Sequence, residues 1–183
     1  MSERGPVINI VIAGLGGQGI VTAADILADA AFRAGFDVKK SEIHGMSQRG
    51  GSVSSDVRFG EQVHSPMVPS GKADFLVITE STQVDPNIHR LKKDGRLITP
   101  DAAPHLFKDD DPASAVQAAR MINVALLAVL SVHLELPESN WLEAIESNLP
   151  ERLHEVNRNV FLHARGVESV IGQLNGAWRP RRK

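Results

Sequence analysis

The sequence predicts an α/β fold: a Rossmann-like, doubly wound mixed sheet with an antiparallel edge hairpin and a helical C-terminal third. Three observations predict it. A short β-branched run at residues 7–12 leads into a glycine-rich turn and then into apolar residues at helical spacing. Residues 52–59 alternate with the two-residue period of a strand. From about residue 111 onward the apolar residues keep helical spacing almost to the end of the chain.

The first part of the chain is expected to form a strand, a helix and a second strand. The run at residues 7–12 has the apolar character of a buried strand. Helical spacing follows over residues 19–34, and Gly35 can end the helix in the left-handed conformation. Residues 36–43 are then expected to form the second strand, so that these elements make one right-handed βαβ unit.

The alternating segment at residues 52–59 is expected to have one buried face and one wet face. The buried face would carry Val53, Ser55, Val57 and Phe59, and the wet face Ser54, Asp56 and Arg58. A strand of this kind is typically antiparallel or near the edge of a sheet. Gly60-Glu61 then predicts a two-residue turn into a short return strand through Val63.

Two more strands are expected in the middle of the chain. Residues 74–79 form a buried run, and residues 96–99 a short strand after an Asp94-Gly95 turn. Between them, Asp85-Pro86 is typical of a helix cap followed by proline at the first helical position.

The C-terminal third is expected to be helical throughout. Asp111-Pro112 repeats the cap signal and begins a helix that should run to about Leu136. The preceding aspartates favour a helix-start charge cluster (Asp109-Asp110-Asp111) over a metal site. Two further helices are centred on residues 141–149 and 156–174, and Asn175-Gly176 closes the last one.

Composition excludes several classes of function. A formal net charge of -2 argues against a nucleic-acid-binding protein. The chain contains no cysteine that could bind an iron–sulfur cluster, and no tyrosine that could act as an acid or base. If the function is redox chemistry, the electron carriers must therefore lie on another chain. The seven histidines show no paired ligand spacing, so we expect no metal site.

The chain is expected to be a cytoplasmic protein of one domain, residues 1–183, with its helical part beginning at about residue 111. Its N-terminus shows no basic segment followed by an apolar stretch, so no signal peptide is predicted. The longest apolar run, residues 121–130, is too short to span a bilayer, so we expect no membrane association.

The turn at residues 14–19 matches the dinucleotide-binding pattern, with glycine at positions 14, 16 and 19. In that pattern, backbone N–H groups at a helix N-terminus point at an anion. Glu42, 23 residues after Gly19, stands where a ribose-binding acid is expected. However, Glu42 leads directly into a polar loop that would fill the space of the dinucleotide. A free-standing nucleotide- or dinucleotide-binding module therefore stays the alternative function.

The polar loop, residues 44–49, carries the other candidate functional side chains: His44, Ser47, Gln48 and Arg49. Arg49 suits a carboxylate or a phosphate because its planar guanidinium can bind either with two hydrogen bonds. The alternative for Arg49 is an ion pair with Glu42, with Glu80 or with a partner chain. His44 is as well explained by a hydrogen bond within the loop as by chemistry. No complete catalytic set is visible, so these residues would be accessory.

Two further polar residues have open roles. Glu80 follows the strand at residues 74–79 and either caps the next segment or lines the cleft. Asn123 lies in an apolar helix and must find a hydrogen-bond partner if it is buried, most simply a nearby backbone group.

Together, residues 14–19 and 42–51 resemble the gamma subunit or domain of 2-oxoacid:ferredoxin oxidoreductases. The match is closest to the small beta subunits of the indolepyruvate:ferredoxin oxidoreductases. The resemblance covers the whole chain, including Gly71-Lys72-Ala73-Asp74 before the third core strand. Two motifs at this mutual spacing are specific, whereas either alone is weak.

The resemblance implies a subunit of an enzyme that decarboxylates a 2-oxoacid with coenzyme A, giving an acyl-CoA and reduced ferredoxin. Thiamine diphosphate and iron–sulfur clusters would lie on a large partner subunit, which passes electrons to ferredoxin. The present chain would bind no cofactor tightly and would be inactive alone. Its oligomeric state in isolation stays open, a homodimer being one candidate. The sequence does not name the 2-oxoacid, because the partner would set most of the specificity.

The resemblance also implies a role for the two loops, which would face the active site of the large subunit and contact coenzyme A or the substrate carboxylate. The expected cofactor-contacting residues are Gly14, Gly16, Gly17, Gln18, Gly19, Ser47, Arg49 and Glu80, with His44, Gln48 and Arg49 as accessory groups. A third alternative is a purely structural subunit, whose glycine-rich turn only packs.

Overall fold

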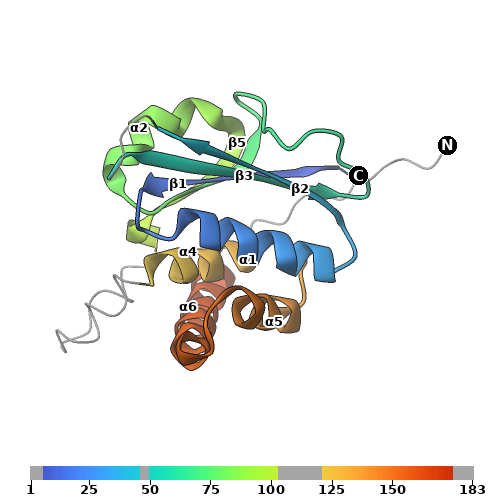
Figure 1. Ribbon diagram of the computed structural model, residues 1–183, viewed down its shortest axis with the longest axis vertical. Coiled ribbons are helices and arrows are strands. Elements are labelled where there is room, and N and C mark those ends of the chain that lie inside the picture. Colours follow the sequence, from blue (N-terminus) through green and yellow to red (C-terminus); the bar gives the residue numbers. More distant parts are fainter. Residues whose placement is uncertain (1–5, 46–49, 103–120, 175–183) are drawn as a thin grey trace.

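A mixed five-stranded sheet forms the centre of the computed structural model, which describes residues 6–45, 50–102 and 121–174 (Figure 1). The strand order is β2-β3-β1-β4-β5. Their bounds are β1 (Ile8–Leu15), β2 (Asp37–His44), β3 (Ser52–Gly60), β4 (Ala73–Ile78) and β5 (Leu91–Ile98). The predicted α/β fold with a mixed sheet is therefore confirmed.

Strand β1 is central because its side chains are apolar on both faces. Ile10 and Ile12 point into the larger apolar core, and Val11 and Ala13 into a smaller one on the other side. β1 pairs with β3 in antiparallel orientation and with β4 in parallel orientation. A strand buried on both faces has no need of alternation, which explains its continuous apolar run.

The predicted βαβ unit needs one correction. β1 and β2 are both antiparallel to β3, so they run in the same direction, but β3 lies between them. Helix α1 (Ile20–Arg33) thus crosses over β3 before β2 forms the edge of the sheet. The antiparallel edge hairpin consists of β2 and β3, because residues 61–72 form no return strand. β3 is therefore an interior strand.

One face of the sheet is covered by two layers of helices (Figure 1). The inner layer consists of α1 and α4 (Ile122–Ser131), and the outer layer of α5 (Glu138–Asn148) and α6 (His154–Leu174). α5 packs on α1, and α6 packs on α4. α4 is buried almost all round, nine of its ten residues being buried, as its apolar sequence predicts.

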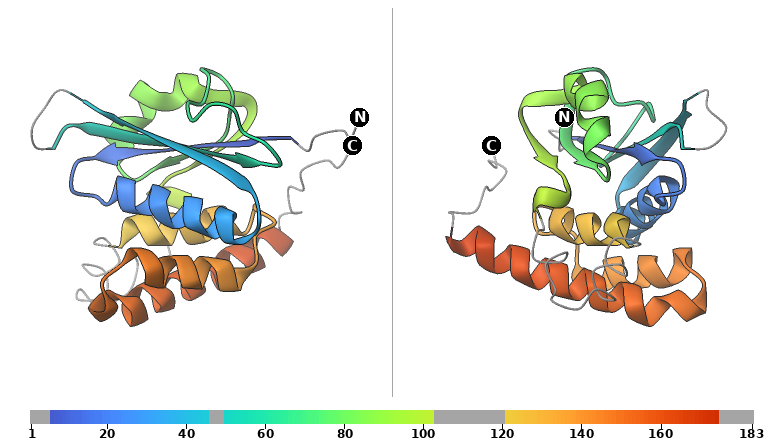
Figure 2. Two further views of the ribbon diagram at one scale, coloured as in Figure 1. Left: turned by 45° about the vertical axis from the view of Figure 1, so that its right-hand side comes forward. Right: turned by 90° about the vertical axis from the view of Figure 1, so that its left-hand side faces the viewer.

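The other face carries a thin cover of short segments (Figure 2). These are residues 61–72 and three single-turn helices: η1 (Ser81–Gln83), α2 (Val84–Asn87) and η2 (Ile88–Arg90). Val68 and Val84 from this cover pack on Val11, Ala13 and Leu76 of the sheet.

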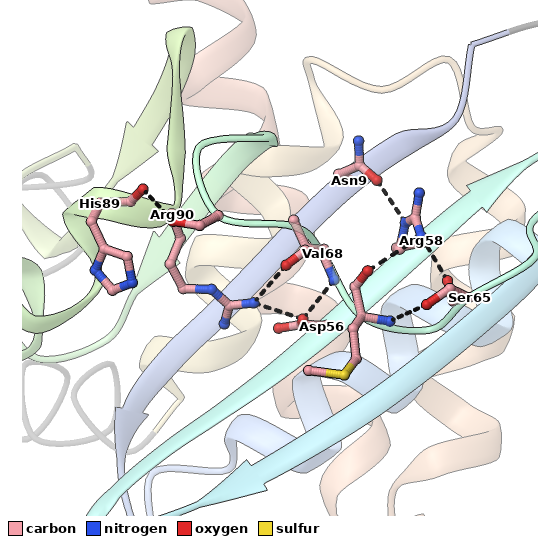
Figure 3. A network of polar contacts seen from close by, with 9 residues as sticks. Asn9, Asp56, Arg58, Ser65, Val68, His89 and Arg90 are labelled. Carbon is pink, nitrogen blue, oxygen red and sulfur yellow. Dashed lines mark hydrogen bonds and ion pairs between the residues drawn. The ribbon is translucent and has the colours of Figure 1, made fainter.

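The face of β3 that was expected to be wet is buried beneath this cover. The Asp56 side chain is fully buried and accepts hydrogen bonds from Arg90 Nη2 at 2.6 Å and from the Val68 amide at 2.8 Å. Arg58 donates to the carbonyl oxygens of Ser65 at 2.8 Å and Met67 at 3.2 Å (Figure 3). The prediction of a wet face was wrong, because polar side chains there bind the backbone that covers them.

Other boundaries differ from the sequence-based expectations. β5 begins at Leu91, five residues earlier than expected, with a register shift against β4 between Ala73 and Phe75. Asp85 lies in the first turn of α2 rather than at its cap. α4 ends at Ser131 instead of running to Leu136.

The start expected for this helix at Asp111, the aspartate cluster and the stop at Asn175-Gly176 lie outside the described residues. No helix in the described part of the chain is long and apolar enough to cross a membrane.

Candidate functional site

The sheet brings the glycine-rich turn and the polar loop together. Leu15 at the end of β1 pairs with Ser52 at the start of β3, so the chain before β3 runs beside the turn after β1. The Gly16 amide donates to the Gly51 carbonyl oxygen at 2.9 Å, and the Gly45 amide donates to the Ser52 carbonyl oxygen at 2.8 Å. The two motifs therefore form one continuous edge.

This edge lies at the topological switch point of the sheet. β1 and β4 are parallel neighbours, but the chain after β1 leads through α1 to β2, while the chain after β4 leads to β5 on the opposite side. Open α/β sheets bind their ligands outside the carboxyl ends of strands at such a point. The glycine-rich turn, Thr79 and Glu80 occupy this position.

Gln18 ties the turn to the end of β4. Its Oε1 atom accepts a hydrogen bond from the Leu15 amide at 2.8 Å and another from Thr79 Oγ1 at 2.7 Å. Its Nε2 atom donates to Glu80 Oε2 at 3.4 Å. The side chain of Gln18 thus joins both halves of the switch point.

Two glycines of the turn are required for different reasons. A Cβ atom on Gly14 would lie 2.0 Å from Thr79 Oγ1, so any side chain there would collide with a neighbour. Gly19 has a φ of 71°, which disfavours L side chains, and caps α1. Asn123 of α4 donates to the Gly19 carbonyl oxygen at 3.2 Å. The sequence predicted a backbone partner for Asn123 but not which one.

The geometry disfavours a dinucleotide at this turn. Three of its amides bond within the protein: Leu15 to Gln18, Gly16 to Gly51, and Gln18 to the Leu15 carbonyl oxygen. In dinucleotide-binding folds, amides of this turn approach the pyrophosphate instead.

The acid expected to bind a ribose is also displaced. Glu42 lies on β2, and because β3 separates β2 from β1, it is one strand further from the turn than the pattern needs. Its carboxylate instead accepts a hydrogen bond from Lys40 Nζ at 2.7 Å, which lowers the pKa of Glu42. His44 Nε2 lies 3.4 Å from the same carboxylate.

The other predicted site residues divide into two groups. The side chain of His44 is 60% exposed at the end of β2. Glu80 precedes η1, but its carboxylate makes no cap and faces Gln18, so of its two expected roles it lines the switch point. Ser47, Gln48 and Arg49 lie outside the described residues. Among the described residues no group of histidine and acidic side chains could hold a metal ion.

Thr79 is a site residue that the sequence did not reveal. It is 4% exposed, and the sequence pattern predicts only that it ends a buried strand. The one signal in the sequence was a hydroxyl at the last position of an apolar run, which alone predicts no contact with Gln18. Gly50-Gly51 belonged to the recognised motif, but their contact with Gly16 required the sheet register.

The comparisons with known proteins decide the family. The family model described as "Pyruvate ferredoxin/flavodoxin oxidoreductase" matches residues 9–168, which is most of the chain. The chain belongs to the pyruvate ferredoxin/flavodoxin oxidoreductase family. The match includes both loops and most of the helical C-terminal third, and it confirms the resemblance seen in the sequence. Like its relatives in this family, the chain is a small subunit of a 2-oxoacid ferredoxin oxidoreductase.

Several relatives within this family are similar to the chain along much of its length. Indolepyruvate oxidoreductase subunit IorB from Thermococcus kodakarensis is 34% identical, over 90% of this chain and 98% of that protein. IorB from Methanothermobacter thermautotrophicus is 29% identical over 84% and 93%. Ketoisovalerate oxidoreductase subunit VorA from the same organism is 28% identical over 93% of this chain, but over only 38% of VorA.

Two solved structures share the fold of this family member. The gamma subunit of a keto/oxoacid ferredoxin oxidoreductase from Geobacter sulfurreducens has a TM-score of 0.73 at 20% identity, over 91% of this chain and 98% of that chain. The 2-oxoglutarate:ferredoxin oxidoreductase from Magnetococcus marinus has a TM-score of 0.75 at 19% identity, over 98% of this chain and 33% of that chain. In the second protein the same fold is thus one part of a longer chain.

Proposed function

We propose that this chain is the small subunit of an indolepyruvate-type, arylpyruvate-oxidising ferredoxin oxidoreductase. The observation that carries the substrate class is the similarity to IorB from Thermococcus kodakarensis, 34% identical over 98% of that protein. The complex would convert a 2-oxoacid and coenzyme A into an acyl-CoA and carbon dioxide, with two electrons passed to ferredoxin. The chain is proposed to act as one domain, in the cytoplasm.

The cofactors are proposed to lie on a partner subunit. The sequence contains no cysteine, so it supplies no thiolate to an iron–sulfur cluster. The family resemblance implies that thiamine diphosphate likewise belongs to the partner subunit. We therefore assign the thiamine diphosphate, which supplies the carbanion chemistry, and the clusters to a large subunit.

The switch-point edge is the surface proposed to meet that subunit. There, the turn at residues 14–19 lies against Gly50 and Gly51, and the exposed His44 stands beside them at the end of β2. The amides used within the turn give it a fixed shape of its own. Such an edge suits contact with a preformed partner surface better than capture of a free dinucleotide.

In some relatives the matching region is part of a longer chain, which supports close contact between this fold and the rest of the enzyme. In the Magnetococcus marinus protein the matching fold is a third of one chain, and in VorA the matching region is a similar share. A domain joined covalently to its neighbours meets them at high effective concentration. We propose that the separate subunit makes the same kind of contact without the covalent link.

The first experiment tests the surface. The chain is co-expressed with its large subunit as wild type, as His44→Ala or Arg49→Ala in the polar loop, and as His64→Ala. His64 is an exposed histidine near Asp37 at the opposite end of β2, so it is a matched control. Assembly and the kinetics for coenzyme A and indolepyruvate are measured. We expect changes in the loop variants only. Wild-type assembly and kinetics in both loop variants would refute the proposal that this edge contacts the large subunit.

The second experiment tests the substrate class. The purified complex is assayed for coenzyme A-dependent ferredoxin reduction with indolepyruvate, pyruvate, 2-oxoglutarate and 2-oxoisovalerate. We expect the highest kcat/KM with indolepyruvate. A higher value with pyruvate or 2-oxoglutarate would contradict the assigned substrate class and leave the family unchanged.

The alternative of a free-standing nucleotide-binding module is tested on the isolated chain. It is titrated with NAD, FAD and coenzyme A by calorimetry. We expect no tight binding of NAD, because Glu42 is displaced and three turn amides already have partners. Saturable binding of NAD with a Kd of about 1 μM, some −8 kcal/mol, would favour the module.

A further inference from the structure

The glycine-rich turn is held from two sides by side chains that lie far away in the sequence. On the sheet side, Gln18 joins the turn to Thr79 and Glu80. On the helix side, Asn123 of α4 donates a hydrogen bond to the carbonyl oxygen of Gly19, the residue that caps α1. The turn is thus fixed at its centre and at its end.

The hydrogen-bonding capacity of Gln18 is largely used by these contacts. An amide oxygen has two lone pairs, and Gln18 Oε1 accepts one hydrogen bond from the Leu15 amide and one from Thr79 Oγ1. Its amide nitrogen is turned toward Glu80. A group engaged in this way is poorly placed to bind a ligand through the same oxygen, although its sequence position suggested that role.

Close packing around Gly14 and Gly19 leaves the glycine-rich turn little room to shift. The space where a Cβ of Gly14 would lie is taken by Thr79 Oγ1 and Gln18 Oε1 at 2.0 and 2.8 Å. The corresponding space at Gly19 is taken by Asn123 Nδ2 at 2.4 Å. Together with Ile20, whose Cδ1 would lie 2.7 Å from a Cβ of Gly14, the three side chains that donate or accept these hydrogen bonds fill the volume that the glycines leave open.

We propose that Gln18, Thr79 and Asn123 are positioning residues, which lock the glycine-rich turn and the start of α1 into the shape that the large subunit's active site requires. This inference rests on the proposed function, in which the turn meets that subunit. The three residues act through the turn backbone and touch no reacting atom.

The test uses Thr79, because the hydroxyl can be removed with little change of shape. Thr79→Val removes the donor to Gln18, and Thr79→Ser keeps it. Thr99→Val makes the same change just after the neighbouring strand β5 and is the matched control. Hydrogen exchange of the Leu15 amide in the isolated chain measures how firmly Gln18 is held, because this amide donates to Gln18 Oε1. We expect faster exchange in Thr79→Val and wild-type exchange in Thr79→Ser and Thr99→Val.

The functional readout is kinetics at saturating small subunit, where every large subunit is occupied. If these contacts hold the turn in the shape that the active site requires, Thr79→Val lowers kcat/KM roughly tenfold in the fully assembled complex. Thr79→Ser, which keeps the hydroxyl, restores the wild-type value. A purely structural role would lower only the thermal midpoint of the subunit and leave kcat and KM unchanged. Asn123→Ala, which removes the second contact, is expected to act in the same direction and serves if Thr79→Val does not fold.

The outcomes separate the two proposals. An active wild-type complex with wild-type kinetics in both Thr79→Val and Asn123→Ala would overturn the positioning role and leave the proposed function standing. A wild-type chain that fails to assemble with the large subunit, or leaves its turnover unchanged, would overturn the proposed function and this inference with it.

Discussion

At the scale of single residues, the glycine-rich turn shows that one motif combines different requirements. Gly14 is required by its close neighbour Thr79, and Gly19 by its positive φ. Gly16 has no such constraint, because a Cβ atom at this position would lie 3.6 Å from its nearest neighbour, the Gly50 amide nitrogen, which is an ordinary contact. In the dinucleotide-binding pattern only the second glycine is needed for approach to the pyrophosphate, whereas the first and third serve the tight turn and close packing. In this chain, close contact explains Gly14 and backbone conformation explains Gly19 without a ligand.

Alanine substitutions distinguish these positions. Gly14→Ala is expected to lower the free energy of unfolding by about 1–3 kcal/mol, because the added methyl group overpacks against Thr79 and Ile20. Gly16→Ala is expected to change it by about 0.5 kcal/mol or less. Urea unfolding of the isolated chain measures both. Equal losses in the two variants would contradict the packing role of Gly14.

At the scale of elements, the polar face of β3 organises the cover on the second face of the sheet. Asp56 and Arg58 hold residues 61–72 through backbone groups, and Arg90 brings η2 to the same place. Alternation along the strand identified these side chains correctly as one face. Alternation could not show that this face is buried, because the segment that covers it, residues 61–72, forms no helix or strand that a sequence pattern would predict.

Arg90→Ala tests this arrangement. Asp56 would keep its hydrogen bond from the Val68 amide but lose its only described cationic partner while fully buried. We expect a loss of about 3–5 kcal/mol in the free energy of unfolding, since an unpaired buried charge is costly. Lys39→Ala removes an exposed pair with Asp37 and is the control, with an expected loss below about 1 kcal/mol. Similar losses in both variants would contradict the prediction.

At the scale of the whole molecule, a polar cluster joins the sheet to the outer helix layer. His133 follows α4, with its ring stacked on Phe75 of β4 at a centroid distance of 6.2 Å. Its Nε2 atom lies 3.4 Å from Glu168 of α6, and Arg96 of β5 lies 3.5 Å from Glu168 and from His133. Burial, followed by the charge of Arg96, lowers the pKa of His133 to about 4.

The lowered pKa of His133 predicts a loss of stability in acid. Between about pH 6.5 and pH 4 the unfolded chain binds a proton at this position and the folded chain does not, so the free energy of unfolding falls as the pH falls. Allowing for partial solvent screening, the contribution is on the order of 1–2 kcal/mol. Burial raises the pKa of Glu168, which acts in the opposite direction over its own range.

The measurement is urea unfolding from pH 7 to pH 4 for wild type and His133→Gln. The variant keeps Glu168, so the difference between the two curves isolates the histidine. We expect the wild-type curve to fall more steeply. Parallel curves would contradict the lowered pKa.

The sequence by itself determined the family, the α/β class and the type and order of most elements. It also determined that the two loops belong together, because their motifs are specific as a pair, and that these residues supply no cysteine ligand to an iron–sulfur cluster. These are local or compositional properties. They depend on spacing along the chain and on residue types alone.

Only the tertiary structure decided which strands are neighbours and which side chains meet. Because β3 lies between β1 and β2, Glu42 lies away from the glycine-rich turn. Because β1 pairs in parallel with β4, Gln18 lies beside Thr79. Contacts of this kind join residues about sixty or a hundred positions apart, such as Gln18 with Thr79 or Gly19 with Asn123. No local pattern encodes them, because they follow from the strand order and from the packing of α4 against the turn.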